Sequence, residues 1–146
     1  MSKVEETPYL DSLELLLSRV VRTYNYKMWQ MSHEVGIYPG QLPVLFLLKN
    51  KNGRVQKELV TKMKVKAATV TVMLNRMEKS GLIERQPDPD DLRASRVYLT
   101  ELGKEKLEQI EEVIKEIEKK CFEGFREEEK ILLRRFLTHM HRNLSE

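Results

Sequence analysis

The chain has 146 residues, of which 34% are charged and 40% hydrophobic, with one cysteine and a formal net charge of +3. This length favours one domain over two independent cores. No apolar run approaches the roughly 20 residues that cross a bilayer, and residues 1–10 do not resemble a secretory signal. A single cysteine excludes an internal disulfide and is typical of a reducing setting, so we expect a cytoplasmic protein that does not bind membranes.

Charge is distributed unevenly along the chain. Residues 49–98 hold 12 basic and 6 acidic side chains, a net charge of +6, whereas residues 1–48 and 99–146 have net charges of −1 and −2. A concentrated basic segment indicates binding to a polyanion, although a solvated lysine-rich surface has the same composition. Three of the 4 Asp fall in residues 88–91, where they predict a turn, whereas the 19 Glu favour helices elsewhere.

Apolar residues recur at three- and four-residue steps from Pro8 to about Val35, which predicts one long amphipathic helix ending at Gly36. Short helices are predicted over residues 39–49, 56–63 and 67–79, the last two joined by a tight connection at 64–66. β-Prone runs at 82–85 and 96–99 predict an antiparallel hairpin whose tip spans residues 86–95.

Two helices are predicted after the hairpin. Thr100 is suited to cap the first of them, and its apolar residues have the spacing of a helix-pairing seam: Leu107, Ile110, Ile114, Ile117 and Cys121. The second starts near Arg126. Apolar faces on the first and last helices favour a homodimer, because twofold dimers are the commonest soluble oligomers. An intramolecular hairpin of these helices is the alternative.

The order helix, tight turn, helix and β-hairpin coincides with the basic segment. This order is typical of a winged helix-turn-helix, whose second helix enters the DNA major groove. Helical spacing over residues 67–79 predicts a buried stripe of Val70, Met73, Leu74 and Met77. The opposite face carries Ala68, Thr71, Val72, Asn75 and Lys79. Thr and Asn can hydrogen-bond base edges, and methyl groups can pack on thymine.

Cationic side chains surround this helix and suit DNA phosphates, although each is equally suited to solvent. The hairpin adds Arg93 at its tip, with Arg85 and Arg96 at its base, and a narrow minor groove attracts arginine. Asp91 is placed to accept hydrogen bonds from Arg93 and set its direction. A pair that only stiffens the hairpin is the alternative.

Residues 36–104 resemble the MarR family of transcription regulators. The likeness is carried by Gln41, Leu45, Gln56, Glu58 and Leu59, by the runs 68–71, 76–85, 87–93 and 97–100, and by Gly103. It implies a mainly α fold with a small β-hairpin wing (α+β). A single domain of residues 1–146 would comprise a winged helix-turn-helix lobe over 37–100 and dimerisation helices over 8–35 and 101–146.

The resemblance also implies a homodimer that binds a palindromic operator in double-stranded DNA, usually as a repressor, and is released by a small phenolic or lipophilic effector. Pattern and resemblance together assign DNA contacts to three groups of side chains. The recognition helix supplies Lys66, Ala68, Thr69, Thr71, Val72, Asn75 and Arg76. The wing supplies Arg85, Asp91, Arg93 and Arg96, with Arg93 entering the minor groove. Backbone contacts come from Lys57, Lys62 and Lys64.

The chain departs from the family pattern within the helix-turn-helix. Val72 stands where an arginine is common, which puts a base or phosphate contact there in doubt. Val55 and Lys66 stand where side chains that cap the two helices are common, and Lys66 adds a phosphate ligand instead. Leu92 is an apolar residue at a variable position of the wing tip.

In this family an effector pocket lies between the dimerisation helices and the winged lobe. Aromatic and methionine side chains near the end of the first helix suit a flat apolar molecule, although such spacing is also typical of packing residues. The candidates are Tyr24, Met28, Trp29, Met31, His33 and Tyr38. Cys121 lies away from the position of the redox-sensing cysteine of some relatives, and we expect it to be buried.

No arrangement typical of a catalytic triad, a phosphate-binding loop or a metal site is found, and we expect no catalytic residues, metal or cofactor. A DNA-binding regulator is therefore the leading hypothesis. The alternative is a winged-helix antirepressor or adaptor that acts mainly through protein contacts and binds DNA weakly and without specificity.

Overall fold

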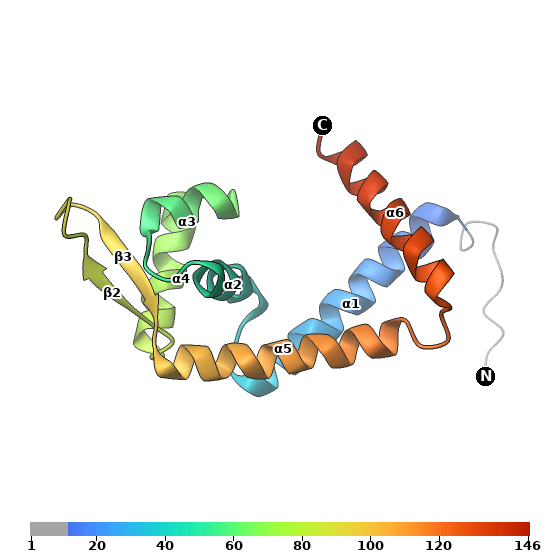
Figure 1. The fold of residues 1–146 in the computed structure, drawn as a ribbon, viewed down its shortest axis with the longest axis horizontal. Coiled ribbons are helices and arrows are strands. Elements are labelled where there is room, and N and C mark those ends of the chain that lie inside the picture. Colours follow the sequence, from blue (N-terminus) through green and yellow to red (C-terminus); the bar gives the residue numbers. More distant parts are fainter. Residues whose placement is uncertain (1–11) are drawn as a thin grey trace. The chain divides into compact units, whose positions relative to one another are not determined.

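The computed structural model describes residues 12–146, which form six α-helices, one 3-10 helix and a three-stranded antiparallel sheet (Figure 1). The predicted mainly α fold with a β-hairpin wing is confirmed. Two compact units divide the chain between residues 113 and 114. Among the described residues, no helix combines the length and the apolar character that a membrane span requires.

Helix α1 spans Leu13–Val35. It begins after Ser12, whose Oγ accepts a 3.2 Å hydrogen bond from the backbone N–H of Leu15, an N-terminal cap. The predicted start at Pro8 lies outside the described residues. The predicted end is confirmed, because Gly36 adopts a left-handed conformation with φ of +87°, which glycine adopts without a steric penalty.

The helix-turn-helix begins with a short 3-10 helix, η2 (Pro39–Gln41), that leads into α2 (Leu42–Asn50). Helix α3 spans Gln56–Met63 and α4 spans Ala67–Lys79, as predicted. Val70, Leu74 and Met77 of α4 are fully buried, which confirms most of the predicted stripe. Met73 is only half-buried, because its side chain lines a groove beside η2.

The sheet contains one strand more than predicted. Its strands are β1 (Arg54–Val55), β2 (Ile83–Pro87) and β3 (Ser95–Leu99), in the order β1-β3-β2. The predicted hairpin tip of residues 86–95 is wrong, because strand pairing continues to Pro87 and Ser95. The backbone N–H of Asp88 then donates to the carbonyl of Ala94 at 3.0 Å, which leaves residues 88–94 as the tip.

Helix α5 spans Glu101–Cys121. Thr100 caps it as predicted, because its Oγ1 accepts a 3.0 Å hydrogen bond from the backbone N–H of Gly103. A Cβ atom on Gly103 would lie 2.1 Å from the carbonyl oxygen of Leu82, so only glycine lets α5 start this close to the end of the α4–β2 connection.

The second unit consists of the end of α5 and α6 (Glu127–Leu144). The predicted burial of Cys121 is wrong for this chain: Cys121 is the last residue of α5 and is exposed, since nothing within residues 12–146 covers it. At the start of α6, Glu129 Oε1 accepts a 3.0 Å hydrogen bond from the backbone N–H of Arg126. This bond and a second one from the Arg126 side chain lower the pKa of the Glu129 carboxyl.

Candidate nucleic-acid interface

The recognition helix α4 displays the side chains that were expected to contact DNA. Its buried residues hold the helix against the core of the lobe, and its remaining surface is exposed. The exposed positions are Lys66, Ala68, Thr69, Thr71, Val72, Asn75 and Arg76. Methyl groups, two hydroxyls, an amide and two cations therefore share a single accessible face, the mixture that base edges and phosphates require.

Thr71 differs from the other polar residues of this face because its hydroxyl is already engaged. Oγ1 donates to the carbonyl of Ala67 at 3.0 Å and accepts from Gln56 Nε2 at 3.1 Å. The second bond joins the two helices of the helix-turn-helix. Because the hydroxyl of Thr71 already donates to Ala67, it has no hydrogen left for the expected bond to a base edge. Thr71 therefore offers its methyl group outward.

The cations expected to contact phosphates have no partners among residues 12–146. Their side chains are exposed, and none makes an ion pair or hydrogen bond within residues 12–146: Lys57, Lys62, Lys64, Lys66 and Arg76. Helices α3 and α4 add backbone donors, because neither Val55 nor Lys66 caps its helix with a side-chain hydrogen bond. Such uncapped N–H groups at a helix start suit a phosphate.

Two arginines of the wing make internal contacts instead. Arg96 Nη1 donates to the carbonyl of Gly53 at 2.9 Å, and its Nε lies 3.4 Å from Oδ1 of the buried Asp88. Arg85 binds Glu78 and Asn75 of α4. The structure therefore places Arg85 and Arg96 where they connect the wing to its surroundings, and neither guanidinium is fully available to DNA.

Arg93 lies at the exposed wing tip as expected, but its relation to Asp91 is different. Asp91 Oδ1 accepts a 3.0 Å hydrogen bond from the backbone N–H of Arg93, and no ion pair joins the two side chains. The expected charge-assisted pair is therefore wrong. The backbone amide two residues ahead is the nearer donor, an arrangement that aspartate commonly makes in turns, and the Arg93 guanidinium has no partner within residues 12–146.

Sequence reasoning missed Arg54 and Asp88, which shape the interface from within. The Arg54 guanidinium is buried and donates to the carbonyl of Leu47 at 3.0 Å, to Asn50 Oδ1 at 3.0 Å and to Glu58 Oε1 at 2.6 Å. It thereby joins the end of α2 to the first turn of α3. The four-residue spacing of Arg54 and Glu58 was the available signal, but that spacing is also common on exposed helices.

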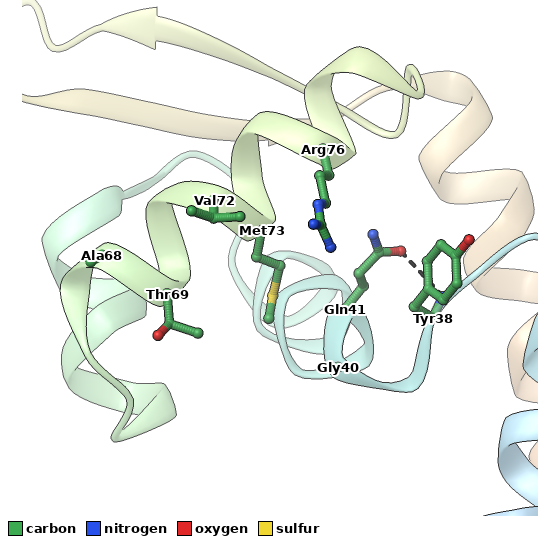
Figure 2. A pocket seen from close by; sticks show the side chains of 8 residues that line it. All are labelled: Tyr38, Gly40, Gln41, Ala68, Thr69, Val72, Met73 and Arg76. Carbon is green, nitrogen blue, oxygen red and sulfur yellow. Dashed lines mark hydrogen bonds between the residues drawn. The ribbon is translucent and has the colours of Figure 1, made fainter.

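A groove of about 470 Å³ runs between η2 and α4 (Figure 2). Tyr38, Gly40 and Gln41 line one side, and the other side is formed by Ala68, Thr69, Val72, Met73 and Arg76. Figure 2 shows the Arg76 guanidinium pointing toward Gln41, whose Oε1 accepts a 3.3 Å hydrogen bond from the backbone N–H of Tyr38. The lining of the groove is therefore mainly apolar and includes one cation, Arg76.

Three of the residues expected to form an effector pocket make ring contacts with one another. Trp29 and His33 stack with ring centroids 5.5 Å apart, and His33 lies 6.1 Å from Tyr38. These rings form an exposed stack, whereas Met28 is buried in the core and Tyr24 is 43% exposed. Tyr38 links the stack to the groove beside α4.

Electrostatics single out one carboxylate on α4. Hydrogen bonds from the Arg85 side chain hold the pKa of Glu78 below its ordinary value of 4.5. Among the described residues, no three potential metal ligands come together.

Comparison with known proteins gives a consistent result. The model of the MarR family matches residues 37–95. The HTH-type transcriptional repressor IacR of Pseudomonas putida is 31% identical over 129 residues, which are 88% of this chain and 77% of IacR. A MarR family protein from Bacillus stearothermophilus has a similar structure, with a TM-score of 0.78 and 25% identity over 95% of this chain and 97% of that one.

The repressor CouR bound to a 23-mer DNA duplex shares the fold, with a TM-score of 0.81 and 23% identity over 96% of this chain and 99% of that one. Regulators of this kind are not enzymes. The chain belongs to the MarR family of winged-helix, DNA-binding transcriptional regulators.

Proposed function

We propose that the protein is a homodimeric repressor that binds a palindromic operator and is released by a small aromatic or lipophilic effector. The observation that carries the proposal is the exposed face of α4, surrounded by cations that have no partner within residues 12–146. The relative IacR is described as a transcriptional repressor, and CouR was solved as a repressor on DNA. Within one domain we assign residues 37–100 to the DNA-binding lobe. The dimerisation helices fall within 8–35 and 101–146, of which the structure describes 12–35 and 101–146.

In this proposal the α4 face reads the major groove and Arg93 enters the minor groove. Lys57, Lys62 and Lys64 contact phosphates together with the open N-termini of α3 and α4. The test is selection from randomised DNA duplexes by the full-length protein. A repressor enriches one palindrome, and its affinity for that palindrome falls steeply as salt rises. Equal binding to all duplexes supports the adaptor alternative instead.

Uncovered apolar side chains support the homodimer. In α1, Leu13, Val20 and Val21 are 87%, 59% and 48% exposed, and α6 has no buried residue at all. Leu132 and Phe136 of α6 are 46% and 49% exposed. Apolar surface of this kind is stabilised when a second copy covers it.

A charge on the apolar face of α6 tests the dimer. Phe136→Glu should convert the dimer to a monomer in sedimentation or light-scattering measurements, as should truncation near residue 125. Thr138→Glu is the matched control, because Thr138 is exposed on the same helix and points away from the direction of Phe136. A dimer that survives both Phe136→Glu and the truncation would refute the assignment of these helices.

We propose that the effector binds where the stacked rings of Trp29 and His33 meet the groove beside α4, which Tyr38 also lines. Flat aromatic surfaces beside an apolar groove with one cation suit a small aromatic acid or phenol. Trp29 is the one tryptophan of the chain, so its fluorescence reports binding there directly. Salicylate should quench this fluorescence and release DNA over the same concentration range. Release without quenching would place the effector elsewhere.

A further inference from the structure

Arg85 of β2 contacts two side chains of the recognition helix at once. Its Nη2 donates to Asn75 Oδ1 at 2.5 Å and to Glu78 Oε1 at 3.1 Å. Its backbone N–H and its Nε donate to Glu78 Oε2 at 3.1 and 3.4 Å. The Glu78 carboxylate therefore binds one edge of the guanidinium with both oxygens, and the guanidinium in turn binds the amide of Asn75.

This contact determines which way the Asn75 amide faces. Arginine has donors and no acceptor, so the atom of Asn75 that faces Arg85 must be the carbonyl oxygen. Because the amide is planar, its amino group, Nδ2, then points away from Arg85. Asn75 is exposed, and its Nδ2 donates no hydrogen bond within residues 12–146. The helix consequently presents a donor at this position.

The base that such a side chain recognises follows from major-groove chemistry. Asparagine recognises adenine with both arms of its amide, because Oδ1 accepts from adenine N6 while Nδ2 donates to N7. The amide oxygen keeps a second lone pair, but the charge-assisted bond with Arg85 fixes its direction, so it does not turn freely toward adenine N6. Guanine offers O6 and N7, thymine offers O4 and adenine offers N7, and each of these acceptors matches a lone donor, whereas cytosine offers only its N4 donor.

We infer that Arg85 is a specificity-positioning residue: it holds Asn75 as a lone hydrogen-bond donor, so that Asn75 selects against cytosine and does not favour adenine over the other bases that offer an acceptor. The inference rests on the proposed function, because it names the base preference of the same DNA interface. Arg85 acts through Asn75, and Glu78 fixes the position of Arg85. The wing thereby controls what the recognition helix reads, in addition to its own contacts with DNA.

The experiment is the selection of operator sequences from randomised duplexes by the full-length protein and four variants. Asn75→Ala identifies the base position that Asn75 reads, because only that position should lose its preference. The wild type should disfavour cytosine there by about tenfold, within the range for a good base contact, and should show no preference for adenine over guanine. Arg85→Met releases the amide and should shift the preference to adenine.

Arg93→Met is the matched control for the loss of a guanidinium from the wing. It should weaken binding to every sequence and leave the preference at the Asn75 position unchanged. If Arg85→Met behaves in the same way, Arg85 is a backbone ligand and the inference is overturned. A wild-type preference for adenine at the Asn75 position overturns it as well, as does an Asn75→Ala variant that changes no position.

Asn75→Asp keeps the test decisive if Arg85→Met does not fold. Aspartate retains the bond with Arg85 and has no donor to present, so the discrimination against cytosine should disappear while circular dichroism stays native. An unchanged preference in Asn75→Asp overturns the inference. If the wild type enriches no sequence at all, the proposed function itself fails. If the wild type enriches a clear motif that Arg85→Met leaves intact, only the inference about Arg85 fails.

Discussion

The backbone N–H of Arg93 donates a 3.0 Å hydrogen bond to the side-chain oxygen of Asp91, and the guanidinium of Arg93 takes no part in it. The carbonyl of Asp91 also accepts from the backbone N–H of Ala94 at 2.9 Å. Both bonds shape the turn at the wing tip. Asp91 therefore positions Arg93 through the backbone, and a neutral acceptor of the same shape can do this as well as a charged one.

Substitutions of Asp91 separate these two roles. Asp91→Ala removes the acceptor, and we expect operator affinity to fall about 3- to 10-fold, because a hydrogen bond worth roughly 0.5–1.5 kcal/mol no longer orders the tip. Asp91→Asn keeps an oxygen in place and should restore near wild-type affinity in a fluorescence anisotropy titration. If Asn fails to rescue, the charge of Asp91 matters and an ion pair with Arg93 forms on DNA.

Among the cations of the lobe, we expect the loss of Arg54 to lower the free energy of unfolding most. Arg54→Met leaves the carbonyl of Leu47, the side chain of Asn50 and Glu58 without their shared donor, and hydrogen bonds of charged groups are worth about 1.5–3 kcal/mol each. We expect the free energy of unfolding to fall by about 2–3 kcal/mol in urea at fixed protein concentration. Lys51→Met, at an exposed neighbouring position, should change it by less than about 0.5 kcal/mol.

Helix periodicity and local end signals were enough to predict the helices of the lobe. Gly36 and Thr100 act at helix ends through bonds within a few residues, which sequence patterns describe well. Strand β1 could not be predicted in this way. Two residues are too few to show alternation, and Arg54 and Val55 become a strand only because β3 lies beside them.

The residues of the interface could be predicted from the sequence, but the hydrogen bonds and ion pairs that their side chains make within the protein could not. Lys62 and Arg85 look alike in a sequence, yet Lys62 is exposed without a partner among residues 12–146, whereas Arg85 is bound by Glu78. The hydroxyl of Thr71 is engaged by Gln56 from the neighbouring helix, a contact between residues 15 positions apart. Contacts of this kind depend on how the helices pack, which periodicity does not describe.

Glu78 should make the stability of the lobe depend on pH. Because Arg85 lowers the folded-state pKa of Glu78 below its ordinary value of 4.5, the stabilisation is complete above that value and is lost as pH falls through the folded-state pKa. The difference in unfolding free energy between wild type and Glu78→Gln should therefore be constant near neutral pH and narrow in acid below about 4.5. Chemical denaturation across this range measures it.

The Arg85→Met background supplies the control for this pH effect. With the guanidinium absent, the hydrogen bonds that lower the pKa are absent too, so adding Glu78→Gln should produce no difference that varies with pH. A difference of the same size in both backgrounds would mean that Arg85 is not the cause of the lowered pKa.

Lys64 occupies a position in which stability and DNA binding oppose each other. It ends α3 with φ of +55°, the one non-glycine residue within 12–146 with a positive φ. A left-handed conformation costs a residue with a Cβ atom about 1 kcal/mol, so Lys64→Gly should raise the free energy of unfolding by about 0.5–1 kcal/mol. The same change removes a phosphate ligand and should weaken DNA binding.

Lys64→Ala separates the two effects, because alanine also lacks the charge but keeps the strain. Both variants should reduce the slope of log affinity against log salt by about 1 for each half-site, whereas only Lys64→Gly should be more stable than the wild type. Unchanged salt slopes in both variants would remove Lys64 from the DNA interface. Equal stability of the glycine and alanine variants would show that the helix-turn-helix connection relaxes its backbone without glycine.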